Sequence, residues 1–516
     1  YRNLPALPYS MINRARIRLL HFNMGKMNMC DVMFKLALIL AASITGAALW
    51  HRTINMWTMK NLGDAFLTKD VGSRMIVLGT FFREKSEQNV MGKYAIVHFL
   101  GDSREVHDIF CHSTRANGQP MTTRAYIQRI HQGKRAANDI CAWAGHIAEC
   151  EVSESTNGSF RISVTRDASD ALVVIPEVPK EKKQHDLAVC VAPMYIYTDW
   201  EIMLTGIETW LAMGATKIIV PIQSASETTY KILQEYEKQG IEESHVNCLF
   251  YAKSFADMIV FTDIDDMLLP VHPEQVKAGG NVEILRSIFA DHPQAGSLLF
   301  EHRDTQMRLP QVSPSSLSSF NFDFLHESKS KQNCQVWRMK TRVAVKAGRV
   351  DSVNMHETGI HRFGYVQTRV PCRIGHFYHL RHSHSSVADS TPIQLGNLAT
   401  ILNNNWQKRL ESTFSSLLNE TLIRSETDSF RDFDRCMGAI NEEHWTLHVS
   451  RCLTPHVCYS RLRRDMACVA STTDYQFVRS GSGYLIGQDK QRFIPAQTNC
   501  EAHVPVFTDG NHYFAP

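Results

Sequence analysis

The stretch MIVFTDIDDMLLP, residues 258–270, joins a strand-forming run to a dense cluster of acidic side chains. Its first five residues are apolar or β-branched, which is typical of a buried strand. Asp263, Asp265 and Asp266 follow at once, before the chain turns apolar again. The pattern therefore predicts an interior strand that carries three carboxylates at its carboxyl end.

A divalent cation is the simplest explanation for this acidic cluster. Ligands of open α/β sheets bind beyond the carboxyl ends of the strands, and neighbouring carboxylates repel one another unless a cation is bound. Mn²⁺ or Mg²⁺ takes one or two carboxylates together with phosphate oxygens. Because Asp263 and Asp265 alternate onto the same side of an extended chain, we predict that they bind the metal while Asp266 assists or orients them. An acidic loop that caps the next helix is the alternative.

Strands and helices alternate around this stretch. Buried strands are predicted at 187–195 and 216–222, and helices at 199–215, 228–240 and 247–257. The first of these helices has an amphipathic spacing, with Asp199 as its N-cap and Gly214 just past its end. Strand–helix–strand alternation predicts an α/β domain with a mainly parallel sheet.

Residues 52–180 are strand-rich instead. Apolar runs such as RMIVLGTFF and YAIVHFL alternate with polar stretches, which indicates a stem followed by a small β-sandwich-like lumenal domain. A helical insert is predicted near 121–148. The charged, proline-containing segment 176–185 is the predicted linker to the α/β domain.

The N-terminal part of the chain contains an apolar segment, residues 32–51, in which Lys35 is the one charge before the final histidine. Its length suits a membrane-spanning helix. Basic residues precede it with no acid before Asp31, which predicts a cytoplasmic tail over 1–31 and a lumenal location for the rest. A cleaved signal peptide is the alternative.

Composition and cysteine usage agree with a folded lumenal protein. The 516 residues are 44% hydrophobic, and a net charge of +3 is too small to imply a nucleic-acid partner. The 13 cysteines show no CxxC spacing, which favours disulfides in an oxidising compartment over zinc. Five of them lie in a Cys-rich C-terminal extension, residues 406–516.

Three parts of the chain, 189–240, 251–270 and 338–383, resemble glycosyltransferase family 92. The resemblance implies a GT-A nucleotide-sugar-binding domain over 186–405, an N-terminal β-sandwich, and a single-pass type II protein of the Golgi membrane. It also implies an inverting β-1,4-galactosyltransferase that uses UDP-galactose and Mn²⁺ on a glycan or glycoprotein acceptor, such as fucose of N-glycans. The Cys-rich tail is similar to that of nematode members.

The resemblance also suggests roles for residues away from the acidic cluster. His379 in FYHLRHS is the predicted third metal ligand, and Arg381 is expected to contact phosphate, while Asp263 also touches the ribose. Pro193 and Tyr195 are expected to face the base, with Tyr195 stacked on uracil. A structural role for His379 and a plain turn with a packed Tyr195 are the alternatives.

Four further residues are predicted around the acceptor. An inverting displacement needs a general base, and Glu301, followed by Asp304, is nominated because these acids follow the apolar strand-like run SLLF. A surface ion pair between Glu301 and Arg303 is the alternative. His356 and Glu357 are expected to line the acceptor side or to serve only as a loop.

The sequence also departs from the family pattern. Six residues link Gly240 to Asn247, where family members carry a longer stretch with another strand. This departure leaves two functions open besides an active galactosyltransferase. One is an inactive relative that binds a glycan or a partner. The other is a metal-dependent phosphodiesterase or phosphatase, which would need further His and Asp residues near the motif.

Overall fold

The protein is described here by a computed structural model. The described residues are 43, 74–85, 92–102, 106–130, 143–156, 158–176, 183–194, 197–222, 224–238, 242–243, 248–270, 272, 276–307, 315–331, 341–353, 356–382, 390–418, 420–422, 468–472, 475–481, 483–489 and 494–498. The chain divides into two compact units, Tyr1–Phe66 and Leu67–Pro516. Within the described residues no helix is both long and apolar enough to cross a membrane. The predicted span 32–51 lies outside them apart from Ser43.

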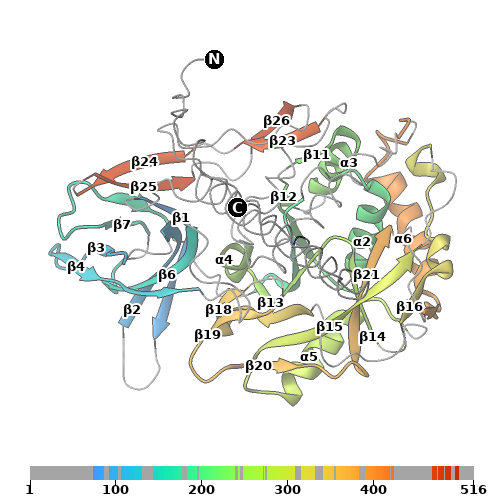
Figure 1. Cartoon of the computed structure of the whole chain (residues 1–516), viewed down its shortest axis with the longest axis horizontal. Helices are drawn as coiled ribbons and strands as arrows, with labels where there is room; N and C mark the ends of the chain where they lie inside the picture. The colour runs from blue at the N-terminus through green and yellow to red at the C-terminus, as the bar shows by residue number, and fades with distance from the viewer. Residues whose placement is uncertain are drawn as a thin grey trace, which may run out of the picture. The chain divides into compact units, whose positions relative to one another are not determined.

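The strand-rich region consists of two sheets around one apolar core (Figure 1). The six-stranded sheet has the order β24 (Tyr475–Ser480), β25 (Tyr484–Asp489), β1 (Arg74–Lys85), β2 (Gly92–Asp102), β6 (Trp143–Val152) and β5 (Tyr126–Arg129). The four-stranded sheet has the order β4 (Pro120–Arg124), β3 (Phe110–Thr114), β7 (Phe160–Ser163) and β8 (Leu172–Val174). A disulfide between Cys111 and Cys150 joins the two sheets.

The helical insert predicted near 121–148 is wrong wherever the structure describes it. Strands β4 and β5 occupy its first part, and β6 begins at Trp143. The side chains of β4 alternate between exposed and half-buried positions, which is the period of a strand rather than of a helix. Residues 131–142 lie outside the described part of the chain.

The α/β region is built on an eleven-stranded sheet. Its main path runs β12 (Glu242–Glu243), β10 (Lys217–Val220), β9 (His185–Val191), β13 (Ala256–Thr262), β17 (Thr341–Lys346), β15 (Ala295–Met307), β16 (Lys329–Lys331) and β22 (Ser390–Pro392). Off this path, β20 (Val366–Arg369) and β21 (Gly375–His382) pair with β15, and β14 (Asp266–Pro270) pairs with β21. A separate two-stranded sheet contains β18 (Val350–Val353) and β19 (Thr358–His361).

The sheet is mixed, so the prediction of a mainly parallel sheet holds for only one half. Strands β12, β10, β9 and β13 are parallel neighbours, as the alternating pattern predicts. From β13 onward the path β17–β15–β16–β22 is antiparallel. An antiparallel partner needs no crossover helix. Among the described residues between β15 and β17, the helices are accordingly limited to the short η2 (Leu317–Ser319) and η3 (Asp323–Glu327).

The helices flank this sheet. They are α2 (Trp200–Ala212), α3 (Glu227–Glu237), α4 (Cys248–Lys253), α5 (Gly280–Asp291), α6 (Leu398–Ser412) and the short η4 (Ala347–Arg349). Helix α2 follows Asp199 and is followed by Gly214, whose φ of 103° is the left-handed conformation that favours glycine. All its residues but Leu211 are buried, because α6 packs on it and Arg409 pairs with Glu208 at 2.6 Å. The predicted boundary at 405 falls inside α6.

The C-terminal extension takes part in both regions. Strand β25 pairs in parallel with β1 of the six-stranded sheet. Strand β23 (Cys468–Thr472) pairs with β11 (Ser224–Ser226) beside α3, and β26 (Ile494–Thr498) completes this three-stranded sheet. Figure 1 shows the red strands β23 and β26 next to β11. The extension therefore contributes strands to the six-stranded sheet and to the three-stranded sheet that contains β11.

Candidate functional site

The three acidic residues form a tight turn at the end of β13. The amide of Asp266 donates to the carbonyl of Asp263 at 3.2 Å, which closes the turn, and β14 starts at Asp266. The three side chains differ in exposure: that of Asp266 is fully buried, whereas those of Asp263 and Asp265 are 29% and 23% exposed. Adjacent acids thus lie in different environments.

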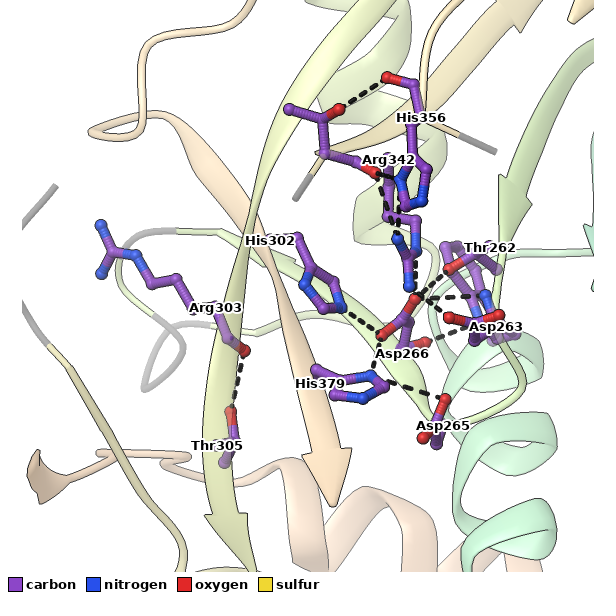
Figure 2. Close-up of polar contacts among 12 residues, drawn as sticks. Thr262, Asp263, Asp265, Asp266, His302, Arg303, Thr305, Arg342, His356 and His379 are labelled. Carbon is purple, nitrogen blue, oxygen red and sulfur yellow. Dashed lines mark hydrogen bonds and ion pairs between the residues drawn. The ribbon is translucent and has the colours of Figure 1, made fainter. Parts of the chain in front are cut away.

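Asp266 is the centre of a hydrogen-bond network (Figure 2). His302 Nε2 and His379 Nδ1 both donate to Oδ1, at 2.8 and 2.7 Å. The Thr262 hydroxyl donates to Oδ2 at 3.1 Å, and so does the amide of Asp263. Arg342 Nε also pairs with Oδ2. With this many donors, Asp266 serves as an anchor for its neighbours rather than as an open metal ligand.

These donors outweigh the cost of burying the Asp266 carboxylate. Burial alone raises the pKa of a carboxyl group, but hydrogen bonds from His302 and His379 and the charge of Arg342 hold the pKa of Asp266 well below its usual value. Burial and neighbouring charges also compete at His379, but there the net shift of the pKa is upward. Burial works to lower its pKa, yet the carboxylates of Asp265 and Asp266 prevail and raise it.

The antiparallel half of the sheet brings the donors to the acids. Arg342 lies on β17, which pairs directly with β13. His302 lies on β15, the next strand along, and His379 lies on β21, where its backbone pairs with that of Asp266 on β14. Arg342 is 2% exposed and also pairs with Asp263. Its pKa is raised: burial opposes the charge, but Asp266 and Asp263 more than compensate.

Asp265 is the acid with the least compensation. Burial raises its pKa to about 7, and the negative charges of Asp266 and Asp263 add to this effect. His379, whose Nδ1 lies 3.6 Å from Asp265 Oδ1, only partly offsets it. Of the three acids, Asp265 therefore gains most from an additional cation.

The residues fit a divalent cation. Ligand atoms of Asp263, Asp265, Asp266 and His379 lie within 4.8 Å of one another. Because Asp266 already accepts several hydrogen bonds, Asp263 and Asp265 are the carboxylates that remain for a metal. When the neutral ring of His379 donates its Nδ1 proton to Asp266, the lone pair is on Nε2, which is then the metal-binding nitrogen.

The structure does not direct Glu301 toward the acidic cluster. Successive side chains of a strand point to opposite faces, and His302 on β15 reaches Asp266. Figure 2 shows Arg303 on the other side of this strand. Arg303 Nε donates to Glu301 at 3.1 Å, and both side chains are buried. The alternative of a pair between Glu301 and Arg303 is thus what the structure contains, although the pair is buried instead of lying on the surface.

The structure describes the other predicted site residues only in part. The backbone of Asp304 pairs with that of His379, and Arg381 lies two residues further along β21, but both side chains lie outside the described part of the chain. Pro193 is exposed just past β9, and Tyr195 is outside the described residues.

Of the two residues predicted for the acceptor side, His356 contacts the network. It is exposed, and its Nδ1 donates to the carbonyl of Thr341 at 2.9 Å, beside Arg342. Glu357 is partly buried.

Sequence reasoning missed Arg342 and His302. Arg342 stands in the run TRVAVK, where a lone arginine in a strand-forming stretch is a recognisable sign of a buried ion pair. His302 follows the apolar run SLLF directly after Glu301, and only the fold shows that it faces Asp266. Tyr197 was also missed: burial, followed by the charges of Asp199, Asp265 and Asp263, raises its pKa well above the usual value.

The comparison with known proteins finds a match to the part of the chain that contains the acidic cluster. Residues 185–243 and 241–431 match the family model of glycosyltransferase family 92. The match confirms the resemblance to glycosyltransferase family 92 that the sequence indicates for this part of the chain. The two matches meet at 241–243, the place where the sequence departs from the family pattern.

Two similar proteins come from Caenorhabditis elegans. Glycosyltransferase family 92 protein F59C6.8 is 22% identical over 271 residues, 47% of this chain and 49% of that protein. Protein ZK381.2 of the same family is 20% identical over 339 residues, 56% of this chain and 63% of that protein. The chain spans about half the length of the first relative. The crystal structure of S. aureus TarS 1-349 covers 31% of this chain and 47% of its own at 11% identity and a TM-score of 0.19, a likeness too slight to carry an argument.

Proposed function

We propose that the protein is a glycosyltransferase of the GT-A type that moves a sugar from a nucleotide diphosphate to a glycan acceptor with a divalent cation. The observation that carries the proposal is the contrast between the buried Asp266, which accepts hydrogen bonds from several donors, and its two partly exposed neighbours. Asp263 shares Arg342 with Asp266, and among the described residues Asp265 has only His379 as an ion-pair partner, at 3.6 Å. This contrast supports a metal at the carboxyl end of β13, where ligands of such sheets bind. The match of the surrounding residues to the family 92 model supports the reaction class.

The proposed transfer balances as a displacement at the anomeric carbon. The acceptor hydroxyl oxygen forms the new bond, the bond from that carbon to the phosphate oxygen breaks, and the nucleoside diphosphate leaves with the electron pair. A bound Mn²⁺, held by Asp263, Asp265 and His379, would offset the charge that develops on the leaving diphosphate. The chain itself orients these ligands through Asp266 and supplies a base for the hydroxyl proton.

Asp304 is the stronger candidate for that base. Its backbone pairs with that of His379, so it lies on the strand pair that borders the acidic cluster. Glu301 is already paired with Arg303. Arg381, on the same strand as His379, is proposed to contact the donor phosphates, and the segment with Pro193 and Tyr195 to face the base.

We further propose galactose as the transferred sugar, UDP-galactose as the donor, and a Golgi location with an N-terminal anchor at 32–51. The disulfides Cys111–Cys150 and Cys190–Cys248 support an oxidising compartment. The anchor rests on its apolar sequence alone.

The proposal is tested by donor turnover. Purified protein is incubated with UDP-galactose, UDP-glucose and UDP-N-acetylglucosamine, each with a fucose- or galactose-terminated acceptor, and UDP release is measured with Mn²⁺ and with EDTA. Release of UDP that needs both acceptor and metal is expected, with UDP-galactose preferred. Turnover unaffected by EDTA would contradict the metal, and a preference for another donor would contradict galactose.

A second candidate function has one observation in its favour. Within the described residues, the sheet continues beyond β10 as the two-residue strand β12, in the short link where the resemblance predicts more chain. This favours an inactive relative that binds a glycan or a partner. A folded protein that binds no UDP with Mn²⁺ would support it.

A further inference from the structure

The C-terminal extension reaches the end of the sheet where the donor is proposed to bind. Strand β11 continues from the carboxyl end of β10, and its residues Ser224, Ala225 and Ser226 pair with β23 in an antiparallel register. On its other edge β23 pairs with β26, so β23 is a central strand of this small sheet. Cys468 and Val469 are 2% and 5% exposed, and Val469 belongs to the apolar core that includes β9 and β13. The contact is thus a packed one.

A continuous set of backbone hydrogen bonds leads from β11 to the acidic cluster. Tyr197 donates to the carbonyl of Ser224 at 3.1 Å and accepts from the amide of Ser226 at 2.9 Å. The amide of Ser224 in turn donates to the carbonyl of Met194 at 3.1 Å. One step further, the amide of Ala192 donates to the carbonyl of Thr262, the residue before Asp263, at 2.8 Å.

Tyr197 belongs to the same set of backbone hydrogen bonds. Burial, followed by the charges of Asp199, Asp265 and Asp263, raises its pKa. It packs against the main core, and its backbone pairs with that of Ala225 on β11. Residues 192–194 are therefore held on one side by Thr262 of β13 and on the other by Ser224 of β11, which pairs with β23.

We propose that the strand pair β23–β26 contributes to the donor site, because through β11 it holds residues 192–194 beside the end of β13 that leads into the metal-binding turn. The affinity for the nucleotide diphosphate therefore depends on residues 468–472 and 494–498, which lie outside the part of the chain that matches the family model. Between these strands, β24 and β25 join the sheet of β1, which secures the extension at a second place. This inference rests on the proposed function, since it assumes that a nucleotide diphosphate binds here.

Hydrogen exchange tests the inference without any substitution. The full chain, purified in detergent, is compared with and without UDP in the presence of Mn²⁺. Slower exchange is expected in 222–226 and also in 468–472 when UDP binds. If UDP binds and exchange in 468–472 is unchanged, the inference is overturned while the proposed function stands. If UDP does not bind at all, the proposed function fails first and the inference with it.

A substitution pair gives an independent readout. Ala470 on β23 pairs with Ser224 on one side and with Ala496 on the other, so Ala470→Pro removes a backbone donor from a central strand. Arg479→Pro is the matched control, because it lies in the same extension but on the edge strand β24.

Ala470→Pro is expected to weaken UDP binding at least tenfold and to raise the KM for the donor more than it lowers kcat. Arg479→Pro should change UDP affinity less than twofold. Thermal unfolding shows whether each variant is folded. A folded Ala470→Pro protein with unchanged UDP affinity would overturn the inference, and if this variant does not fold, the exchange experiment decides.

Discussion

The parallel and antiparallel halves of the main sheet contribute opposite charges to the candidate site. The parallel half ends β13 in three acids that are neighbours in the sequence. Strands β15 and β17 of the antiparallel half supply His302 and Arg342, and β21, which pairs with β15 and β14, supplies His379. These residues are 36, 76 and 113 residues from Asp266 in the chain. In the fold, the three acids therefore have positively charged and hydrogen-bonding partners that the sequence does not show. A further cation is needed mainly beside Asp263 and Asp265.

The largest effect is expected from removing the buried cation of the antiparallel half. Arg342→Ala leaves Asp266 buried without its arginine partner and releases Asp263. The free energy of unfolding should fall by about 3–5 kcal/mol, as when one partner of a buried pair is lost. Urea unfolding measures it. Lys346→Ala, on the same strand but paired with the partly exposed Asp257, is the control and should cost less than about 1 kcal/mol.

Substitution of the two candidate bases on β15, Asp304 and Glu301, should lower kcat to different extents. Asp304→Asn is expected to lower kcat by about 10²-fold or more, in the range of a lost general base, because its backbone borders the acidic cluster. Glu301→Gln should have a much smaller effect on kcat, because Glu301 pairs with Arg303. Single-turnover rates with saturating donor measure both. A larger loss for Glu301→Gln would reverse the assignment.

The two histidines on Asp266 should separate stability from metal binding. His379 also lies near Asp265, whereas His302 is buried with its Nδ1 unpartnered within the described residues. His379→Ala should weaken Mn²⁺ binding by about 10–100-fold. His302→Ala should change it less than about threefold and instead reduce the free energy of unfolding by about 1–3 kcal/mol. Equal losses of Mn²⁺ affinity in the two variants would contradict this division.

The smallest effect is a pH dependence of metal binding. Burial raises the pKa of Asp265 to about 7 in the metal-free protein. Below this pH a proton competes with the metal for the carboxylate, and above it the carboxylate is already ionised. Mn²⁺ affinity should therefore fall about tenfold from pH 8 to pH 6, and protonation of His379, whose pKa is also raised, acts in the same direction. Electron paramagnetic resonance of free Mn²⁺ measures it, and a flat profile would argue against Asp265 as a ligand.

Local patterns predicted the parallel half of the sheet. Strands β9, β10 and β13 and helices α2 and α3 are continuous periodic runs, so their residues alone identify them. The acidic turn was identifiable for the same reason. Helix α2 is nevertheless buried on nearly every side, because the covering helix α6 comes almost two hundred residues later.

Non-local pairing explains what the sequence could not show. Arg342 reaches Asp266 only because β17 inserts between β13 and β15 in an antiparallel register. Nothing near His302 indicates that it faces the acids rather than the opposite side, where Arg303 lies. The pairing of β23 with β11 likewise joins segments more than two hundred residues apart. Each of these contacts depends on the register of distant strands.

Calorimetric titration of Mn²⁺ into the metal-free protein, followed by UDP, tests the central claim most directly. The wild type should bind one Mn²⁺, and UDP should bind only afterwards. Asp265→Asn should lose both events while unfolding like the wild type, and Asp257→Asn, at the other end of β13, should lose neither. Normal Mn²⁺-dependent UDP binding by Asp265→Asn would contradict the claim that the acidic turn holds the metal.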